Sequence, residues 1–283
     1  MYSKFEVSVG NFCYGQEMNS HLSSGQSIFA ECRSDVKSVL EKYILPTGAL
    51  DGDMMKEEWF KTQKYDVFLS HSHKDIDKVK AFSGWLYDKF GLKCFIDSCV
   101  WGYCDDLLRK IDDKYCWNKS GETYNYERRN YSTAHVHMML STALTEVMDL
   151  SECVMFFNTP NSVSLVDDLN CIKNGNNKHG KVKVSISPWI YHELAMSSYL
   201  KQTIPDRLRK KYSTFAEHSE IRAQKELEIQ YKISKYLEGM NKLSDEGLLM
   251  WNNQYKKSKL VHPLDVLYEQ YKSNAYTGEV ING

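Results

Sequence analysis

The chain has 283 residues, of which 42% are hydrophobic and 26% are charged. This balance predicts a packed globular core and excludes a disordered or fibrous protein. The formal net charge of −1 gives no reason to expect nucleic acid as a partner. The first ten residues lack the pattern of a secretory signal, and no apolar run approaches the length of a membrane span. We therefore expect a cytoplasmic protein with no nucleic-acid and no membrane partner.

The cysteines and histidines give no metal signature. None of the eight cysteines forms a Cys-x-x-Cys pair, so in a reducing compartment we expect free, buried thiols. Cys94, Cys99 and Cys104, together with His135 and His137, lie at spacings that match no common zinc pattern. We therefore expect no metal site.

Both ends of the chain are weakly patterned. Residues 35–43 and 53–62 carry apolar side chains at helical spacing, and we assign residues 1–62 to a helical N-terminal extension. Polar and apolar residues alternate over 227–233, which predicts a half-exposed strand at a sheet edge. Residues 236–283 are assigned to a helical C-terminal extension.

A strand, a helix and a second strand follow the N-terminal segment. Residues 65–71 form a short apolar run that stops at polar residues, as a buried parallel strand does. Apolar side chains at helical spacing predict a helix over 77–90 that ends at Gly91. A second strand is predicted over 92–98, and the three elements together form a βαβ unit.

The middle of the chain continues this alternation. Residues 99–131 are polar and aromatic, and we predict a long loop there with one short helix over 105–115. A clear helix is predicted over 132–150 and a third buried strand over 152–158. Residues 160–185 are rich in Asn, Gly and Lys and are interpreted as a loop.

The segment Ser187-Pro-Trp-Ile-Tyr-His-Glu-Leu194 has the features of a helix start. Ser187 suits the capping position, and proline is tolerated at the first helical position. Trp189 and Glu193 are four residues apart and share one helical face. An aromatic ring above a carboxylate suits a cationic, ring-bearing substrate. The alternative is an ordinary helix with one core tryptophan and one surface glutamate.

Ligands of open parallel sheets bind beyond the carboxyl ends of the strands. Polar residues from four segments should converge there: Ser70, His71, Ser72 and His73; Asp97, Ser98 and Trp101; Asn158 and Thr159; and the helix of Trp189 and Glu193. His71 and His73 are equally compatible with ordinary residues of this edge. The chain lacks the G-x-G-x-x-G, Walker, G-x-S-x-G and H-E-x-x-H motifs. Ser70 and His71 are adjacent on a strand and point to opposite faces, which disfavours a serine hydrolase built on them.

Three motifs together resemble the Toll/interleukin-1 receptor (TIR) domain over roughly residues 64–200. They are Tyr65-Asp-Val-Phe-Leu-Ser-His71, Phe95-Ile-Asp-Ser98 and the Trp-x-x-x-Glu helix at 187–194. The chain is most similar to bacterial members associated with antiphage defence systems such as Thoeris. The resemblance implies an α/β, flavodoxin-like TIR domain with a central, mostly parallel sheet. We assign it to residues 63–235, with long insertions between its second and third strands and before the Trp/Glu helix.

The resemblance also implies an enzyme that consumes NAD⁺ as its substrate and needs no cofactor. Glu193 takes the position of the family's catalytic glutamate. The implied substrate-binding residues are Ser70, His71, Ser72, His73, Asp97, Ser98, Trp101 and Trp189. Cleavage of the nicotinamide–ribose bond needs no strong nucleophile, because nicotinamide leaves as a neutral ring. One carboxylate near the ribose can stabilise the oxocarbenium-like transition state. The product would be ADP-ribose, a cyclic isomer or an ADP-ribose conjugate.

The partners implied by the resemblance are further copies of the chain, bound through TIR contacts, and a downstream effector that senses the nucleotide product. Two other interpretations stay open. The domain could be a non-catalytic scaffold that acts by self-association, in which case no carboxylate is needed at position 193. It could also be another N-glycosidic enzyme, such as a nucleoside deoxyribosyltransferase, which also uses a glutamate on an α/β sheet.

Overall fold

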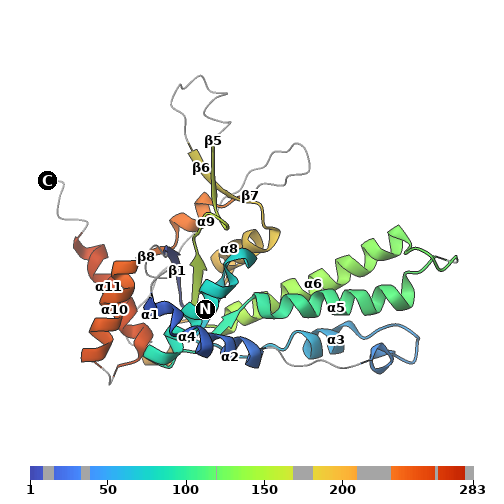
Figure 1. Cartoon of the computed structure of the whole chain (residues 1–283), viewed down its shortest axis with the longest axis horizontal. Coiled ribbons are helices and arrows are strands. Elements are labelled where there is room, and N and C mark those ends of the chain that lie inside the picture. The colour runs from blue at the N-terminus through green and yellow to red at the C-terminus, as the bar shows by residue number, and fades with distance from the viewer. Residues whose placement is uncertain are drawn as a thin grey trace.

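A parallel β-sheet forms the centre of the protein (Figure 1). The computed structural model describes residues 1–8, 16–32, 39–118, 120–167, 181–208, 231–258 and 261–277. Within them the central sheet has five strands in the order β3-β2-β4-β1-β8, all parallel. Their bounds are β1 (Ser3–Ser8), β2 (Val67–Ser70), β3 (Cys94–Ile96), β4 (Cys153–Phe157) and β8 (Asn241–Ser244). A smaller antiparallel sheet contains β5 (Ser164–Asp167), β6 (Lys181–Ser185) and β7 (Tyr231–Lys232).

Helices surround the central sheet. The α-helices are α1 (Gln16–Asn19), α2 (Leu22–Cys32), α3 (Gly52–Trp59), α4 (Ile76–Phe90), α5 (Ser98–Tyr115), α6 (Tyr126–Leu150), α8 (Pro188–Tyr199), α9 (Ser234–Glu238), α10 (Asp245–Lys257) and α11 (Pro263–Thr277). Short 3₁₀ turns are η2 (Leu40–Tyr43), η3 (His73–Asp75) and η4 (Asp206–Leu208). This arrangement is an α/β fold consistent with a flavodoxin-like architecture.

The two faces of the sheet bury different helices, because successive side chains of a strand point to opposite sides. Val67 and Leu69 of β2 belong to a cluster with side chains of α4, α10 and α11. Phe68 lies between them in sequence and packs with side chains of α3, α5 and α6. Phe156 of β4 packs with α8 and α9. Even-numbered residues of β2 therefore face the side that carries α8.

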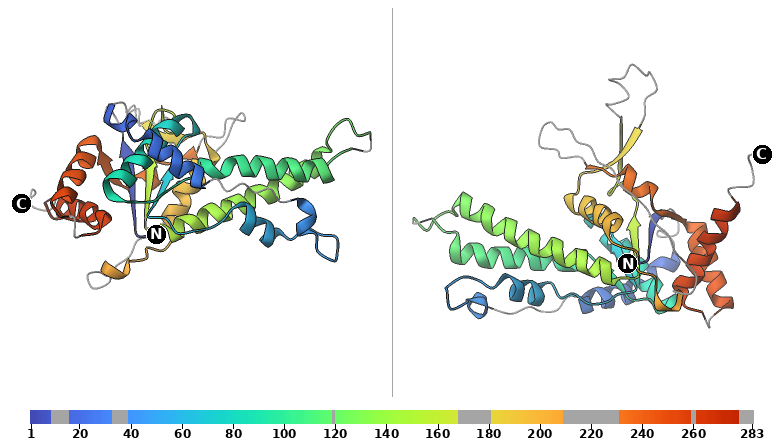
Figure 2. Two further views of the ribbon diagram at one scale, coloured as in Figure 1. Left: turned by 60° about the horizontal axis from the view of Figure 1, so that its bottom comes forward. Right: turned by 180° about the vertical axis from the view of Figure 1, so that it is seen from behind.

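Helices α5 and α6 form a long pair that projects away from the sheet (Figures 1 and 2). Helices α10 and α11 lie on the opposite side of the sheet in the same views. The amino end of α5 and the carboxyl end of α6 lie next to the strands, because α5 begins two residues after β3 and α6 ends three residues before β4. The helix pair is thus joined to the sheet by short connections at the end that lies next to the strands.

Helices α2 and α4 approach each other unusually closely at two glycines. A Cβ atom on Gly84 would lie 2.0 Å from the backbone oxygen of His21, and one on Gly25 would lie 1.7 Å from that of Lys80. Both distances are far below van der Waals contact, so only glycine fits at this crossing.

The predicted βαβ unit is confirmed. Strands β2 and β3 are parallel neighbours joined by α4, and Gly91 ends α4 with a left-handed φ of 69°. The helix predicted over 132–150 is also confirmed, although it begins earlier, at Tyr126. The helix predicted over 105–115 begins at Ser98, because Asp97 caps it directly after β3.

Three expectations about irregular or helical segments were wrong. The first 62 residues are not purely helical, since β1 lies inside the central sheet between β4 and β8. The C-terminal segment is not purely helical either, because it supplies β8. Residues 160–185 include both β5 and β6, which pair as an antiparallel ladder. These strands were not predicted because polar and charged residues interrupt their apolar residues, so they contain no continuous apolar run.

Several predictions fall partly outside the described residues. The edge strand predicted over 227–233 is described only from residue 231, where β7 pairs with β6. Cys13 and Cys171 lie outside the described residues, whereas Cys94, Cys99, Cys104, Cys116 and Cys153 are buried thiols that form no disulfide, as expected. Among the described helices, none combines the length and apolar character that a bilayer crossing requires.

Candidate functional site

The order of the central strands defines where a ligand site is expected. From β2 the chain first adds β3 on one side and then crosses to β4 on the other. Such a reversal leaves a crevice beyond the carboxyl ends of the strands at the switch point. Here those ends are Ser70 of β2, Ile96 of β3 and Phe157 of β4. Most of the residues predicted to converge lie at this edge.

Glu193 reaches this edge from α8. Ser187 caps α8 by accepting a hydrogen bond from the Ile190 N–H, and Pro188 is the first helical residue, as predicted. Glu193 follows one and a half turns into the helix and has only 1% of its surface exposed. The Ser70 hydroxyl donates a 2.5 Å hydrogen bond to Glu193 Oε2. The alternative of a surface glutamate is therefore wrong.

The Glu193 carboxyl group is held in an environment that favours its neutral form. Burial raises its pKa well above the ordinary value, and the negative charge of Asp97 raises it further, while the Ser70 hydrogen bond opposes both. Glu193 Oε1 has no hydrogen-bond donor among the described residues. A hydrogen bond between Glu193 and the neighbouring Asp97 side chain also favours the protonated form of Glu193. Glu193 and Asp97 therefore lie together in this buried space, where burial and the Asp97 charge favour the protonated form of Glu193.

His71, Asp97 and Ser98 form a second connected group at the same edge. His71 Nδ1 lies 2.7 Å from Asp97 Oδ1, and His71 Nε2 lies 2.6 Å from Ser98 Oγ. The Ser98 backbone N–H donates to Asp97 Oδ1 at 2.7 Å. Burial alone would lower the pKa of His71, but the Asp97 carboxylate outweighs it and the pKa is raised.

The remaining predicted residues lie around this centre or away from it. Ser72 precedes η3, and His73 is exposed on that turn. Trp101 is on the first turn of α5. Trp189 is half-buried and packs edge-on against His137 of α6, with ring centroids 5.6 Å apart. The structure thus brings together Ser70, His71, Asp97, Ser98 and Glu193, while the Trp189 ring contacts α6.

Asn158 and Thr159 do extend this edge, but each contacts an acidic residue that sequence reasoning had not connected to it. The Thr159 hydroxyl donates to Asp75 at 2.6 Å, and Asn161 and Lys78 donate to the same carboxylate. These bonds outweigh burial and lower the pKa of Asp75. Asp75 therefore joins the loop after β2 to the loop after β4, which fixes the backbone that follows His71.

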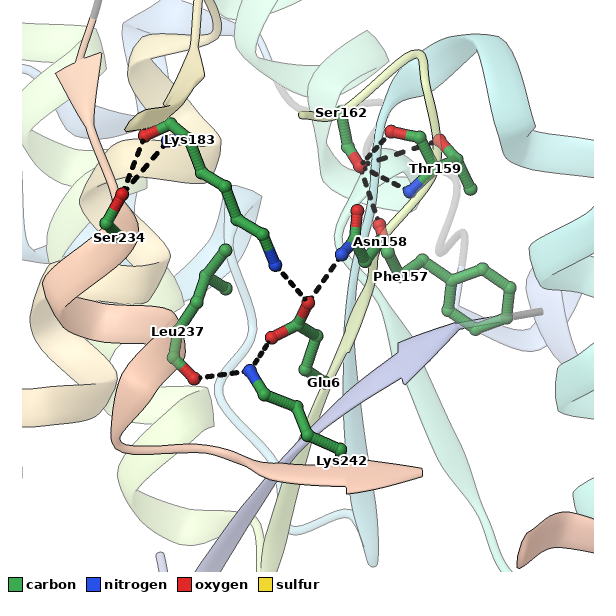
Figure 3. Close-up of polar contacts among 9 residues, drawn as sticks. All are labelled: Glu6, Phe157, Asn158, Thr159, Ser162, Lys183, Ser234, Leu237 and Lys242. Atoms are coloured by element: carbon green, nitrogen blue, oxygen red, sulfur yellow. Dashed lines mark hydrogen bonds and ion pairs between the residues drawn. The ribbon is translucent and has the colours of Figure 1, made fainter. Parts of the chain in front are cut away.

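Glu6 on β1 is a buried acid that sequence reasoning missed (Figure 3). Asn158, Lys183 and Lys242 all donate to its carboxylate. These three donors overcome the effect of burial, so the pKa of Glu6 is lowered. Lys183 belongs to β6 and Lys242 to β8, and the group therefore connects the small sheet to the central one. The alternation of Glu6 with Phe5 and Val7 was the available signal.

One group of possible metal ligands occurs in the described part of the chain. Glu152, His262 and Asp265 place one ligand atom each within 4.8 Å of the others. Arg207 already bonds both carboxylates, with distances of 2.5 Å to Glu152 and 2.7 Å to Asp265. A guanidinium in this position supplies the positive charge that a metal would bring, so the group is better explained as an ion-pair network.

Fold and site together define an α/β protein with a buried glutamate at the switch point of a parallel sheet. A comparison of the chain with protein-family models, curated proteins and solved structures finds no match in any of the three.

Proposed function

We propose that the protein is a TIR-type enzyme that cleaves the nicotinamide–ribose bond of NAD⁺. The observation that supports this most directly is Glu193, a carboxyl group buried at the carboxyl ends of parallel strands and bonded to Ser70. A buried acid with a raised pKa in such a place is typical of a functional site rather than of a structural helix. The position is also the one that the TIR resemblance assigns to the catalytic residue.

In the proposed reaction Glu193 stabilises the positive charge that develops on the ribose. The bond between ribose C1′ and the nicotinamide nitrogen breaks, and nicotinamide leaves as a neutral ring with the bonding electrons. The ionised form of Glu193 is needed for this role. The cationic nicotinamide ring of the substrate lowers the pKa of a nearby acid, so substrate binding and loss of the Glu193 proton support each other. The acceptor is water, an adenine nitrogen of the same molecule, or an external group.

Substrate access requires a movement at this edge, because Glu193 is closed to solvent. The TIR resemblance connects such a movement with self-association, and we propose that copies of the chain assemble before the site is complete. The nucleotide product would then act as a signal in antiphage defence, read by a downstream effector.

The test is nicotinamide release from NAD⁺ by concentrated protein, with the mass of the product determined. Glu193→Gln preserves shape and should reduce the rate by about 10²-fold or more, the range found when one charge-stabilising group is removed. Glu146→Gln is the matched control, because Glu146 bonds Lys56 and Thr62 before β2, at the other end of the sheet. It should retain the wild-type rate. The product mass separates hydrolysis, cyclisation and conjugation.

Folded wild-type protein that releases no nicotinamide, even with extract of phage-infected cells, would reject the proposal. Concentration-dependent assembly in the same samples would then favour the scaffold interpretation.

A further inference from the structure

The contacts of His71 define an ordered chain of three polar side chains. On one side of the ring, Nδ1 lies 2.7 Å from the Asp97 carboxylate. On the other side, Nε2 lies 2.6 Å from the Ser98 hydroxyl. Hydroxyl, imidazole and carboxylate therefore follow one another at hydrogen-bond distance, which is the arrangement of a serine nucleophile, its general base and the acid that orients the base.

The strand register explains why these three residues meet. Strands β2 and β3 are parallel neighbours, and Leu69 pairs with Ile96. Continuing the same register beyond the strand ends sets His71 opposite Ser98. Asp97, between Ile96 and Ser98, caps α5, and its Oδ1 accepts the Ser98 N–H. The geometry follows from two adjacent strands that end together, and neither Ser98 nor His71 depends on a distant loop.

Ser98 is more exposed than His71 and Asp97, as such chemistry needs. Ser98 is partly exposed, whereas His71 and Asp97 are each only 3% exposed. A nucleophile must reach its substrate, while the base and the acid must keep one orientation in a water-poor environment. Ser98 is also the first residue of an 18-residue helix. Its amino end carries partial positive charge beside the hydroxyl, where an oxyanion would form.

We propose that Ser98, His71 and Asp97 form a catalytic triad that transfers acyl groups from carboxylic esters. Ser98 Oγ would attack the ester carbonyl carbon, and its proton would move to His71 Nε2. The bond from that carbon to the alcohol oxygen breaks, and the alcohol leaves with the proton from His71. Water then attacks the acyl group on Ser98, its proton passes through His71, and the carboxylic acid and free Ser98 are regenerated. Asp97 acts as a positioning residue for His71.

The chain contains a second serine–histidine contact that serves as an internal comparison. Ser141 Oγ lies 3.1 Å from His192 Nε2. The contacts of His192 in the described part of the chain are with Ser141, Thr145 and the Trp189 ring, and none is with a carboxylate. Burial lowers the pKa of His192. This contact lacks both the acid and the short distance, so Ser141 should be unreactive.

The test is labelling of the full chain with a rhodamine-linked fluorophosphonate, followed by identification of the labelled peptide. The serine oxygen attacks phosphorus, fluoride leaves with the serine proton, and a stable phosphonate remains. The labelled residue should be Ser98, and no labelling should occur in Ser98→Ala. In His71→Asn, which removes the general base, the labelling rate should be lower by about 10²-fold or more. Ser141→Ala should label as the wild type does. Hydrolysis of p-nitrophenyl acetate should follow the same order.

A pH series distinguishes positioning from simple support of the fold. Asp97 and Asp75 are the acids that raise the pKa of His71, and Asp97 also faces Glu193. Labelling needs neutral His71 and should therefore increase as pH rises through that raised pKa. In Asp97→Asn the increase should move to lower pH, and the maximal rate should fall. A change in the amount of folded protein alone would lower the labelling rate at every pH, but it would not change the pH at which labelling is half-maximal.

Folded wild-type protein that is not labelled, or labelling that persists in Ser98→Ala, overturns the proposal. Melting curves of each variant establish that it is folded. The experiment uses no NAD⁺, so its result is independent of the proposed NAD⁺ cleavage.

Discussion

Among single residues, Glu193 has an unfavourable effect on folding that depends on pH. Its pKa is raised in the folded protein by burial and by Asp97. When the pH is above the ordinary pKa of glutamate, Glu193 loses its carboxyl proton in the unfolded chain but keeps it in the folded protein. The unfolded state then binds fewer protons, so the free energy of unfolding falls as pH rises. This contribution is absent at pH values below the ordinary glutamate pKa.

Glu193→Gln should therefore stabilise the protein at neutral pH. The amide cannot ionise, its oxygen can accept the Ser70 hydrogen bond, and its N–H₂ can donate to Asp97. We expect a melting temperature a few degrees above that of the wild type near pH 7. The difference should shrink toward pH 4. Glu146→Gln should show no gain, because Lys56 and Thr62 lower the pKa of Glu146. A melting temperature of Glu193→Gln at or below the wild-type value at pH 7 would contradict this account.

The residues of the site could be predicted from the sequence to different degrees. Ser70, Asp97 and Glu193 follow from rules about strand ends and helix faces, because those rules act over a few residues. His71 and Ser98 were both expected at this edge, but the contact between them was not predicted. It depends on the register between two strands 27 residues apart. The orientation of Trp189 was not predictable either, because it is set by packing against α6.

At the scale of elements, apolar runs predicted the buried strands β2, β3 and β4 and the helix α4. They failed for β1, whose sequence Ser3–Ser8 includes Lys4 and Glu6. Glu6 is accommodated only because Lys183 and Lys242 reach it from β6 and β8. A local pattern cannot reveal partners more than 170 residues away. Strand β8 was not predicted either, because its only buried residue is Leu243 and its pairing with β1 is not visible in the local sequence.

The close crossing of α2 and α4 involves the helix that directly follows the loop after β2. Gly84→Ala would push a methyl group against the backbone of His21 and separate the two helices. We expect the free energy of unfolding to fall by about 1–3 kcal/mol or more, the range for overpacking. Labelling at Ser98 should also fall, because α4 follows directly from η3, whose Asp75 fixes the backbone after His71.

Gly52→Ala is the control for this prediction. Its Cβ would meet only the Met139 side chain, at 3.5 Å. The same substitution should therefore change the free energy of unfolding by less than about 1 kcal/mol, with a gain expected from reduced chain entropy. Urea unfolding of the two variants provides the comparison. Equal losses in both would show that the close helix crossing is not the cause.

At the scale of the whole molecule, the site depends on segments outside residues 64–200. Strand β1 pairs with both β4 and β8, so it connects the β2–β3–β4 group to the C-terminal helices. Phe5 and Val7 are fully buried in the same cluster as Trp85 of α4 and Trp251 of α10. Residues 64–200 alone would leave β4 without a neighbour on one side and would expose this cluster. We therefore expect that fragment not to fold.

A point substitution in the full chain tests the same dependence without truncation. In Val7→Asp a carboxylate would lie between Phe157 and Leu243, the residues that pair with Val7 in register. An unpaired charge buried at this position costs several kcal/mol, comparable to the roughly 5–15 kcal/mol that stabilises a domain. Ser8→Asp adds the same charge one residue later, where the side chain is exposed. We expect Val7→Asp to lose its cooperative melting transition and its labelling at Ser98, and Ser8→Asp to keep both. If Val7→Asp melted cooperatively and labelled normally, β1 would be an accessory strand, and the site would belong to the 64–200 segment alone.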